Sequence, residues 1–170
     1  MDIPQGPWQE ISINIIGPLP KSNGMDTIVV IVDQFTKMIR LKATTTNILL
    51  EGIAKIYRDD IWKLHRVPKK ILSDRGLQFT LKFMEELTKA LGMKRQLSMA
   101  CHPQTDGQTE RINQEIGTFL RHYMNYQQDD WTNWLAAAEF QYNDKKHVLW
   151  QPRDTKSNDH TTRKSLKMDI

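Results

Sequence analysis

The chain has little that would fix it covalently or hold it in a membrane. Cys101 is the one cysteine among 170 residues, so the sequence excludes an internal disulfide and any zinc site within the chain that needs two cysteines. No apolar run approaches the roughly 18 residues of a membrane span. Residues 1–8 have neither the cationic start nor the apolar stretch of a secretory signal. These absences predict an intracellular protein with no membrane segment, in which Cys101 is a half-buried structural residue.

The composition is that of a folded domain with a modest positive charge. Hydrophobic residues make up 39% of the chain, which allows a packed core, and charged residues are interspersed rather than blocked. The net charge is +4 and the isoelectric point is near 9.2. This balance suits a polyanionic partner, but the charge alone does not decide, because many basic proteins bind no nucleic acid.

Hydrophobic periodicity predicts an α/β fold, a five-stranded mixed sheet flanked by helices. After an extended lead-in over residues 1–9, strands are expected at residues 10–16, 26–33, 37–42, 70–73 and 94–98, and helices at 48–64, 78–91, 108–126 and 130–144. The core domain therefore covers residues 10–147. Residues 148–170 are polar and aperiodic, which predicts a disordered or frameshifted tail.

Two acidic residues are placed where an α/β fold builds its sites. Asp74 follows a short apolar strand, and open α/β sheets bind ligands at such strand ends. Glu110 lies in the first turn of a predicted helix, with 35 residues between the two. The two carboxylates could converge on one divalent ion. Alternatively, Asp74 caps the turn before Arg75 and Glu110 complements the helix dipole, and the spacing leaves both interpretations open.

Four segments resemble the integrase catalytic core of gypsy-type LTR retrotransposons, in the retroviral integrase family. They are residues 7–10 (PWQE), 71–80 (ILSDRGLQFT), 102–113 (HPQTDGQTERIN) and 125–131 (NYQQDDW), and the likeness extends over about residues 7–147. The resemblance implies a ribonuclease H-like fold, with Asp74 as the second aspartate and Glu110 as the glutamate of the family's three metal-binding carboxylates. It also implies DNA binding and DNA integration, through 3′-end processing and strand transfer with two Mg²⁺ or Mn²⁺ ions.

The sequence departs from this pattern at the first carboxylate, where it has Asn14. An asparagine keeps the size and one carbonyl oxygen of an aspartate but loses its negative charge, so the resemblance predicts a catalytically impaired fragment with a weakened metal site. Asp33 on the next predicted strand is a candidate to replace the missing carboxylate, although its position in the family pattern argues against it.

Several residues near these positions have both a functional and a structural interpretation. Arg75, Gln108, Arg111 and Asn113 are candidates for DNA contacts, whereas the two arginines could instead pair with nearby carboxylates. A hydrogen bond that stabilises the loop is favoured for His102. Core packing is favoured for the tryptophans of the predicted helices, Trp62, Trp131 and Trp134.

Two functions remain open at this point. The first is an integrase core from a retrotransposon, a nuclear DNA-binding protein that forms a homo-oligomer and has lost its chemistry with Asn14. The second is a host-retained module with the same fold that binds nucleic acid or dimerises without catalysis. Family members carry an N-terminal zinc module and a C-terminal binding module, neither of which can be built from these residues, so the resemblance also predicts a truncated or decayed copy.

Overall fold

A computed structural model describes residues 5–48, 50–94, 100–103 and 106–149, and it shows one mixed sheet between two layers of helices. Strands β1 (Glu10–Ile16), β2 (Thr27–Asp33) and β3 (Ile39–Thr44) form an antiparallel meander. Strands β4 (Lys70–Ser73) and β5 (Ala100–Pro103) then add to β1 in parallel, which gives the order β3-β2-β1-β4-β5. The predicted mixed α/β sheet and its antiparallel start are confirmed.

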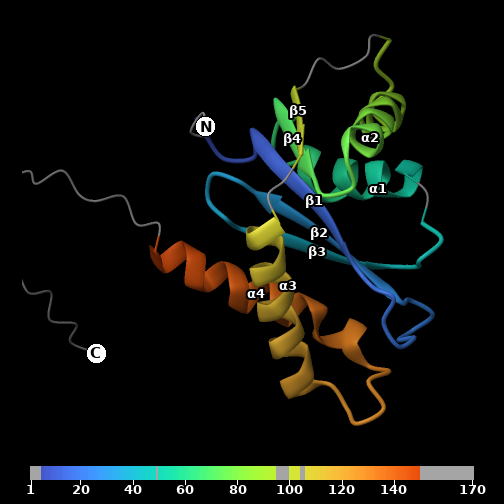
Figure 1. Ribbon diagram of the computed structural model, residues 1–170, viewed down its shortest axis with the longest axis vertical. Helices are drawn as coiled ribbons and strands as arrows, with labels where there is room; N and C mark the ends of the chain where they lie inside the picture. The colour runs from blue at the N-terminus through green and yellow to red at the C-terminus, as the bar shows by residue number, and fades with distance from the viewer. Residues whose placement is uncertain (1–4, 49, 95–99, 104–105, 150–170) are drawn as a thin grey trace, which may run out of the picture.

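Helices cover both faces of this sheet (Figure 1). Helix α1 (Leu50–Tyr57), its continuation as the π-helix η1 (Arg58–Trp62), and α2 (Leu77–Ala90) pack on one face, and α3 (Asp106–Tyr123) and α4 (Trp131–Leu149) on the other. Two hydrophobic cores result because alternate side chains of each strand point to opposite faces. Strand β2 contributes to both cores and is buried along its whole length, as its unbroken β-branched run predicts.

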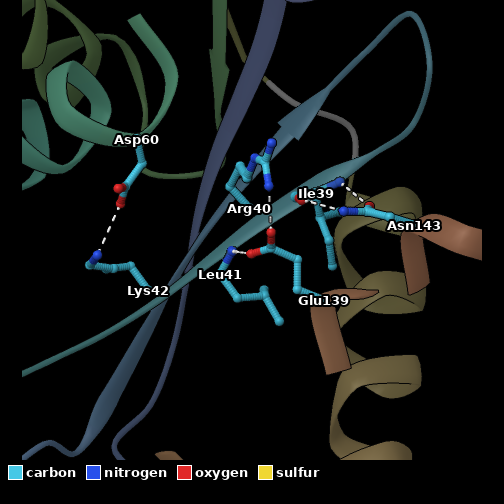
Figure 2. A network of polar contacts seen from close by, with 7 residues as sticks. All are labelled: Ile39, Arg40, Leu41, Lys42, Asp60, Glu139 and Asn143. Carbon is cyan, nitrogen blue, oxygen red and sulfur yellow. Dashed lines mark hydrogen bonds and ion pairs between the residues drawn. The ribbon is translucent and has the colours of Figure 1, made fainter. Parts of the chain in front are cut away.

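Strand β3 lies at the edge of the sheet, and two side chains of α4 occupy its outward hydrogen-bonding groups (Figure 2). The Asn143 amide accepts from the N–H of Ile39 at 2.7 Å and donates to the carbonyl of the same residue at 2.9 Å. Glu139 accepts from the N–H of Leu41 at 2.7 Å and forms an ion pair with Arg40 at 2.7 Å. Helix α4 therefore stands where a further strand would pair.

Three predicted segments differ from the structure. Strand β5 lies at Ala100–Pro103, between the strand predicted at 94–98 and the helix predicted at 108–126. The strand predicted at 94–98 falls almost wholly outside the described residues. Residues 6–9 form turns rather than an extended lead-in, with Trp8 buried at a positive φ of 60°. Helix α4 continues to Leu149, past its predicted end and into the predicted tail. Residues 1–4 and 150–170 lie outside the described part of the chain.

Candidate active site

Asn14 lies on β1, and Asp74 directly follows the neighbouring parallel strand β4. Strands β1 and β4 are paired in a register that sets Ile13 opposite Ser73, so Asn14 is the next residue on β1 and Asp74 is the first residue after β4. Neighbouring strands are about 4.8 Å apart. Asn14 follows Ile13, which faces the α1–α2 layer, so the Asn14 side chain points toward the α3–α4 face. Asp74 lies in the turn after β4 and is exposed.

The side chain of Asn14 is fully buried, with 0% of its surface exposed. The Thr109 hydroxyl, on α3, donates a hydrogen bond to Asn14 Oδ1 at 3.4 Å. The other end of the amide, Nδ2, has no partner among the described residues. If the amide were rotated by 180°, the oxygen would take the place of Nδ2 and would be the atom without a partner. An amide thus fills a buried place in which only one of its two polar ends is satisfied.

The hydrogen bond between Thr109 and Asn14 also brings the start of α3 to the strand ends that carry Asp74. Glu110 is the residue that follows Thr109, and its side chain is exposed, as is that of Asp74. The three predicted site positions thus lie on β1, directly after β4 and on α3, and the hydrogen bond from Thr109 links α3 to β1. One of the three is a buried neutral amide, and the other two are solvent-accessible carboxylates.

The structural alternatives for the two carboxylates are not observed within the described ranges. The hydroxyl of Ser73, rather than the carboxylate of Asp74, accepts from the N–H of Arg75 at 3.1 Å and so stabilises the turn. Helix α3 begins at Asp106, two residues earlier than predicted, which places Glu110 beyond its first turn. Since the attraction of the helix dipole fades within that turn, it gives little reason for an acid at this position.

Asp33 cannot take the place of the missing carboxylate. It pairs with Ile11 at the opposite end of β1, about 10 Å along the strand from Asn14 at 3.3 Å a residue. Its buried carboxylate already accepts hydrogen bonds from the backbone N–H groups of Trp8 (2.9 Å), Phe35 (3.1 Å) and Thr36 (3.1 Å). Asp33 thus closes the turn between β2 and β3 and binds Trp8 to it.

The four predicted DNA contacts are close to this end of the sheet in sequence but differ in exposure. Arg75 and Arg111 are exposed, whereas Gln108 and Asn113 are half-buried. Neither arginine forms an ion pair in the described part of the chain; the guanidinium of Arg75 lies 5.7 Å from the ring centre of Phe79. Both arginines are therefore available to phosphate groups.

Comparison with known proteins shows which proteins this chain resembles. No protein-family model matches the sequence. The chain is 30% identical over 145 residues, 85% of its length, to the transposon Tf2-3 and Tf2-4 polyproteins of Schizosaccharomyces pombe, of which it spans only 11%. Its fold is similar to that of the HTLV-2 integrase catalytic core domain in complex with magnesium, with a TM-score of 0.53 and 19% identity over 79% of this chain and 85% of the other. These likenesses support an integrase catalytic core of a retrotransposon polyprotein.

A second solved structure supports the ribonuclease H-like fold of this integrase core. The simian T-cell lymphotropic virus intasome, in complex with a PP2A regulatory subunit, contains a chain that matches 98% of this one with a TM-score of 0.58 and 16% identity, over 63% of its own length. Both solved structures are less than 25% identical in sequence to this chain, and the similarity to them concerns the fold alone.

The residues of this integrase core do not fit a centre that holds two divalent ions. Mg²⁺ and Mn²⁺ prefer charged oxygen ligands, and among the described residues no group of three or more His, Cys, Asp or Glu is placed to hold a metal. The donors present are the carboxylates of Asp74 and Glu110 and one neutral amide oxygen, on Asn14, which already accepts from Thr109. The three positions that the family resemblance predicts as carboxylates therefore carry two formal negative charges and one neutral amide.

Sequence reasoning missed two features of the integrase core. The first is Thr109, whose link to Asn14 is not signalled by either residue alone. The second is a hollow of about 740 Å³ between α3 and α4 that begins at Arg111 and ends near Tyr123. The side chains of Cys101 and His102 lie outside the described part of the structure, so the interpretations of these two residues remain predictions.

Proposed function

We propose that this chain is an integrase core that binds DNA and does not join it. The observation that carries the proposal is the buried amide of Asn14 beside Asp74, at the position where the family has its first metal-binding carboxylate. The exposed cations Arg75 and Arg111 near this end support contact with the phosphate backbone. No helix of the described residues is long and apolar enough to cross a membrane.

Charge explains why the substitution matters for catalysis. Phosphoryl transfer by two metal ions needs one ion at the attacking oxygen and one at the leaving oxygen. With two carboxylates in place of three, the second ion binds weakly, and the loss of a preorganised charge-stabilising group typically costs at least about 10²-fold in rate. Asp33 does not replace the third carboxylate, because its oxygens accept hydrogen bonds from backbone N–H groups beside the opposite end of β1.

The test is strand transfer by the purified chain with a labelled DNA end and Mg²⁺ or Mn²⁺. We expect no product from the wild type, and metal-dependent product from Asn14→Asp. The doubly substituted Asn14→Asp, Glu110→Gln protein is the control, since it has the same number of carboxylates at the three positions as the wild type. Strand transfer by the wild type at the rate of Asn14→Asp would overturn the proposed inactivity.

Self-association and a nuclear location are parts of the same proposal. The HTLV-2 integrase core is described in a dimeric form, and we propose that this chain also forms a homo-oligomer. Sedimentation at micromolar concentration tests that part directly, and a chain that stays monomeric at every concentration would exclude it.

A further inference from the structure

Trp62 is an exposed tryptophan that the candidate active site does not use. Its place in a helical pattern predicts core packing, and this prediction is wrong, because 41% of its surface is exposed. The π-helix η1 buries Ile61 completely and leaves the indole outside. Short π-helical turns occur frequently at functional sites, and an exposed indole offers a flat face on which a planar ligand can stack.

Two adjoining hollows surround this part of η1. One of about 560 Å³ is lined by Trp62, Lys63, His65, Arg66 and Val67. The other, of about 310 Å³, lies between η1 and the edge strand β3 and shares Lys63 with the first. The second hollow is also lined by the cations Arg40 and Lys42. We call the surface formed by Trp62, Lys63 and Arg66 the tryptophan patch.

The charges of the second hollow are largely cancelled. Asp60 pairs with Lys42 at 3.1 Å, and Glu139 pairs with Arg40 at 2.7 Å, as Figure 2 shows. These two are the acidic residues that line either hollow. Arg40 and Lys42 therefore attract an anion only weakly, because each of them already forms an ion pair with a carboxylate.

The cations of the tryptophan patch are not cancelled in this way. The nearby carboxylate of Asp59 pairs with Arg58 at 2.7 Å. Lys63 and Arg66 are both exposed, and neither forms an ion pair with any described residue. Two cations without an ion pair thus follow an exposed indole within five consecutive residues. Cations beside an exposed aromatic ring are typical of proteins that bind single-stranded nucleic acid.

The backbone beneath the tryptophan patch is held in place at both ends. The His65 N–H donates to the carbonyl of Ile61 at 2.8 Å, and the Lys69 N–H donates to that of Gln9 at 2.7 Å. The ring of His65 also stacks on the buried Trp8, with ring centres 4.9 Å apart and planes 19° from parallel. A fixed backbone reduces the entropy lost when a ligand binds.

This surface is distinct from the candidate active site. The segment from Trp62 to Lys69 leads into the first residue of β4, whereas Asp74 follows its last. The tryptophan patch lies on η1 and the segment that follows it, whereas the Asn14 side chain contacts α3. The patch contains none of the residues proposed to contact DNA at the candidate active site.

We propose that the tryptophan patch is a second nucleic-acid site, which binds single-stranded DNA by stacking one base on Trp62 while Lys63 and Arg66 neutralise phosphates. A duplex keeps its bases stacked on one another, so an exposed indole favours an unpaired strand. The two exposed cations favour a polyanion over an apolar protein surface. The inference goes beyond the proposed function, since it depends on no metal and on no residue of the candidate active site.

Fluorescence titration with a short oligothymidylate in the presence of a metal chelator tests the proposal. Binding is expected to quench the emission of the wild type, and Trp62→Ala is expected to weaken binding about tenfold, the effect of losing one stacked base. Lys63→Ala with Arg66→Ala is expected to reduce the slope of log affinity against log salt by about 1.4, at 0.7 for each phosphate contact on a single strand.

Matched variants distinguish DNA binding at the tryptophan patch from a general effect of lost positive charge. Lys82→Ala with Lys94→Ala removes the same charge from exposed positions elsewhere and is expected to keep the wild-type slope. Trp62→Phe keeps an aromatic ring, so its affinity for the oligothymidylate is expected to lie between that of the wild type and that of Trp62→Ala. It takes the place of Trp62→Ala in the test if the alanine variant does not fold.

Three results would overturn the inference. The first is equal affinity of the wild type, Trp62→Ala and Trp62→Phe for the oligothymidylate. The second is tighter binding to duplex than to single strands, which removes the role of stacking. The third is a Trp62→Ala variant that changes the oligomeric state of the free protein without changing DNA affinity, which would assign the tryptophan patch to contact between copies of the chain.

Discussion

Replacing Asn14 by aspartate should make the stability of the chain depend on metal. Without metal, the new carboxylate is buried where the amide has 0% exposure, in the position next to Asp74. Burial and a like charge both disfavour the ionised form and raise the pKa of such a group. We expect a loss of about 2 kcal/mol in the free energy of unfolding at pH 7, the size of an unsatisfied buried polar group.

The sign of the pH dependence distinguishes this cause from a packing defect. A carboxyl whose pKa is raised on folding costs stability only above its unfolded value, near 4, because below it the group is neutral in both states. The difference between Asn14→Asp and the wild type should therefore shrink as the pH falls toward 4. A defect in packing would persist at every pH.

Mn²⁺ should reverse the loss, because three carboxylates then share a cation. A ligand that binds only the folded state at a hundredfold excess over its Kd adds about 2.7 kcal/mol, or roughly 5–11 °C in unfolding midpoint for a chain of this size. Thermal unfolding with and without Mn²⁺ measures the gain, and calorimetric titration counts the ions. Adding Glu110→Gln to Asn14→Asp should abolish most of the gain. If the wild type gains as much from Mn²⁺ as Asn14→Asp does, the argument that Asn14 disables the site is wrong.

Three further predictions concern the scaffold. Asp33→Ala should lower the free energy of unfolding by about 3 kcal/mol, because Trp8 and the following turn lose a charged acceptor; denaturation by urea should show it, with no change in metal binding. Glu139→Ala should cost about 1–2 kcal/mol, since the N–H of Leu41 loses its partner, and Glu139→Gln should recover part of this loss in the same assay. Burial lowers the pKa of His65, with a smaller effect of the same sign from a nearby arginine, so the unfolded chain takes up a proton more readily and stability should fall as the pH drops below about 6.5. His65→Gln should flatten that part of the profile, and an unchanged profile would refute the assignment.

The elements predicted most accurately from the sequence are those whose hydrophobic pattern fits one kind of secondary structure only. Strand β1 has the predicted bounds, and its Ser12 and Asn14 face away from Ile11 and Ile13, as strict alternation requires. Strand β4 also has the predicted bounds and places Asp74 one residue past its end. In both strands the local period and the tertiary burial favour the same conformation.

Long-range contacts account for most of what sequence reasoning missed. The helix expected at residues 48–64 becomes π-helical at Arg58 and exposes Trp62, although its apolar spacing alone favours burial. The bond between Thr109 and Asn14 joins residues 95 positions apart. Periodicity carries no information about such partners, because they are chosen by the packing of α3 against the sheet.

The side chains that cover β3 set a lower limit on the size of a working fragment. All strands of the described sheet are complete by Pro103, so a shorter chain would seem to contain the whole sheet. A chain cut before Glu139 would nevertheless leave the N–H groups of Ile39 and Leu41 open along an edge, and open edges recruit strands from other molecules. Any soluble fragment, and any designed derivative of this core, therefore has to reach Asn143.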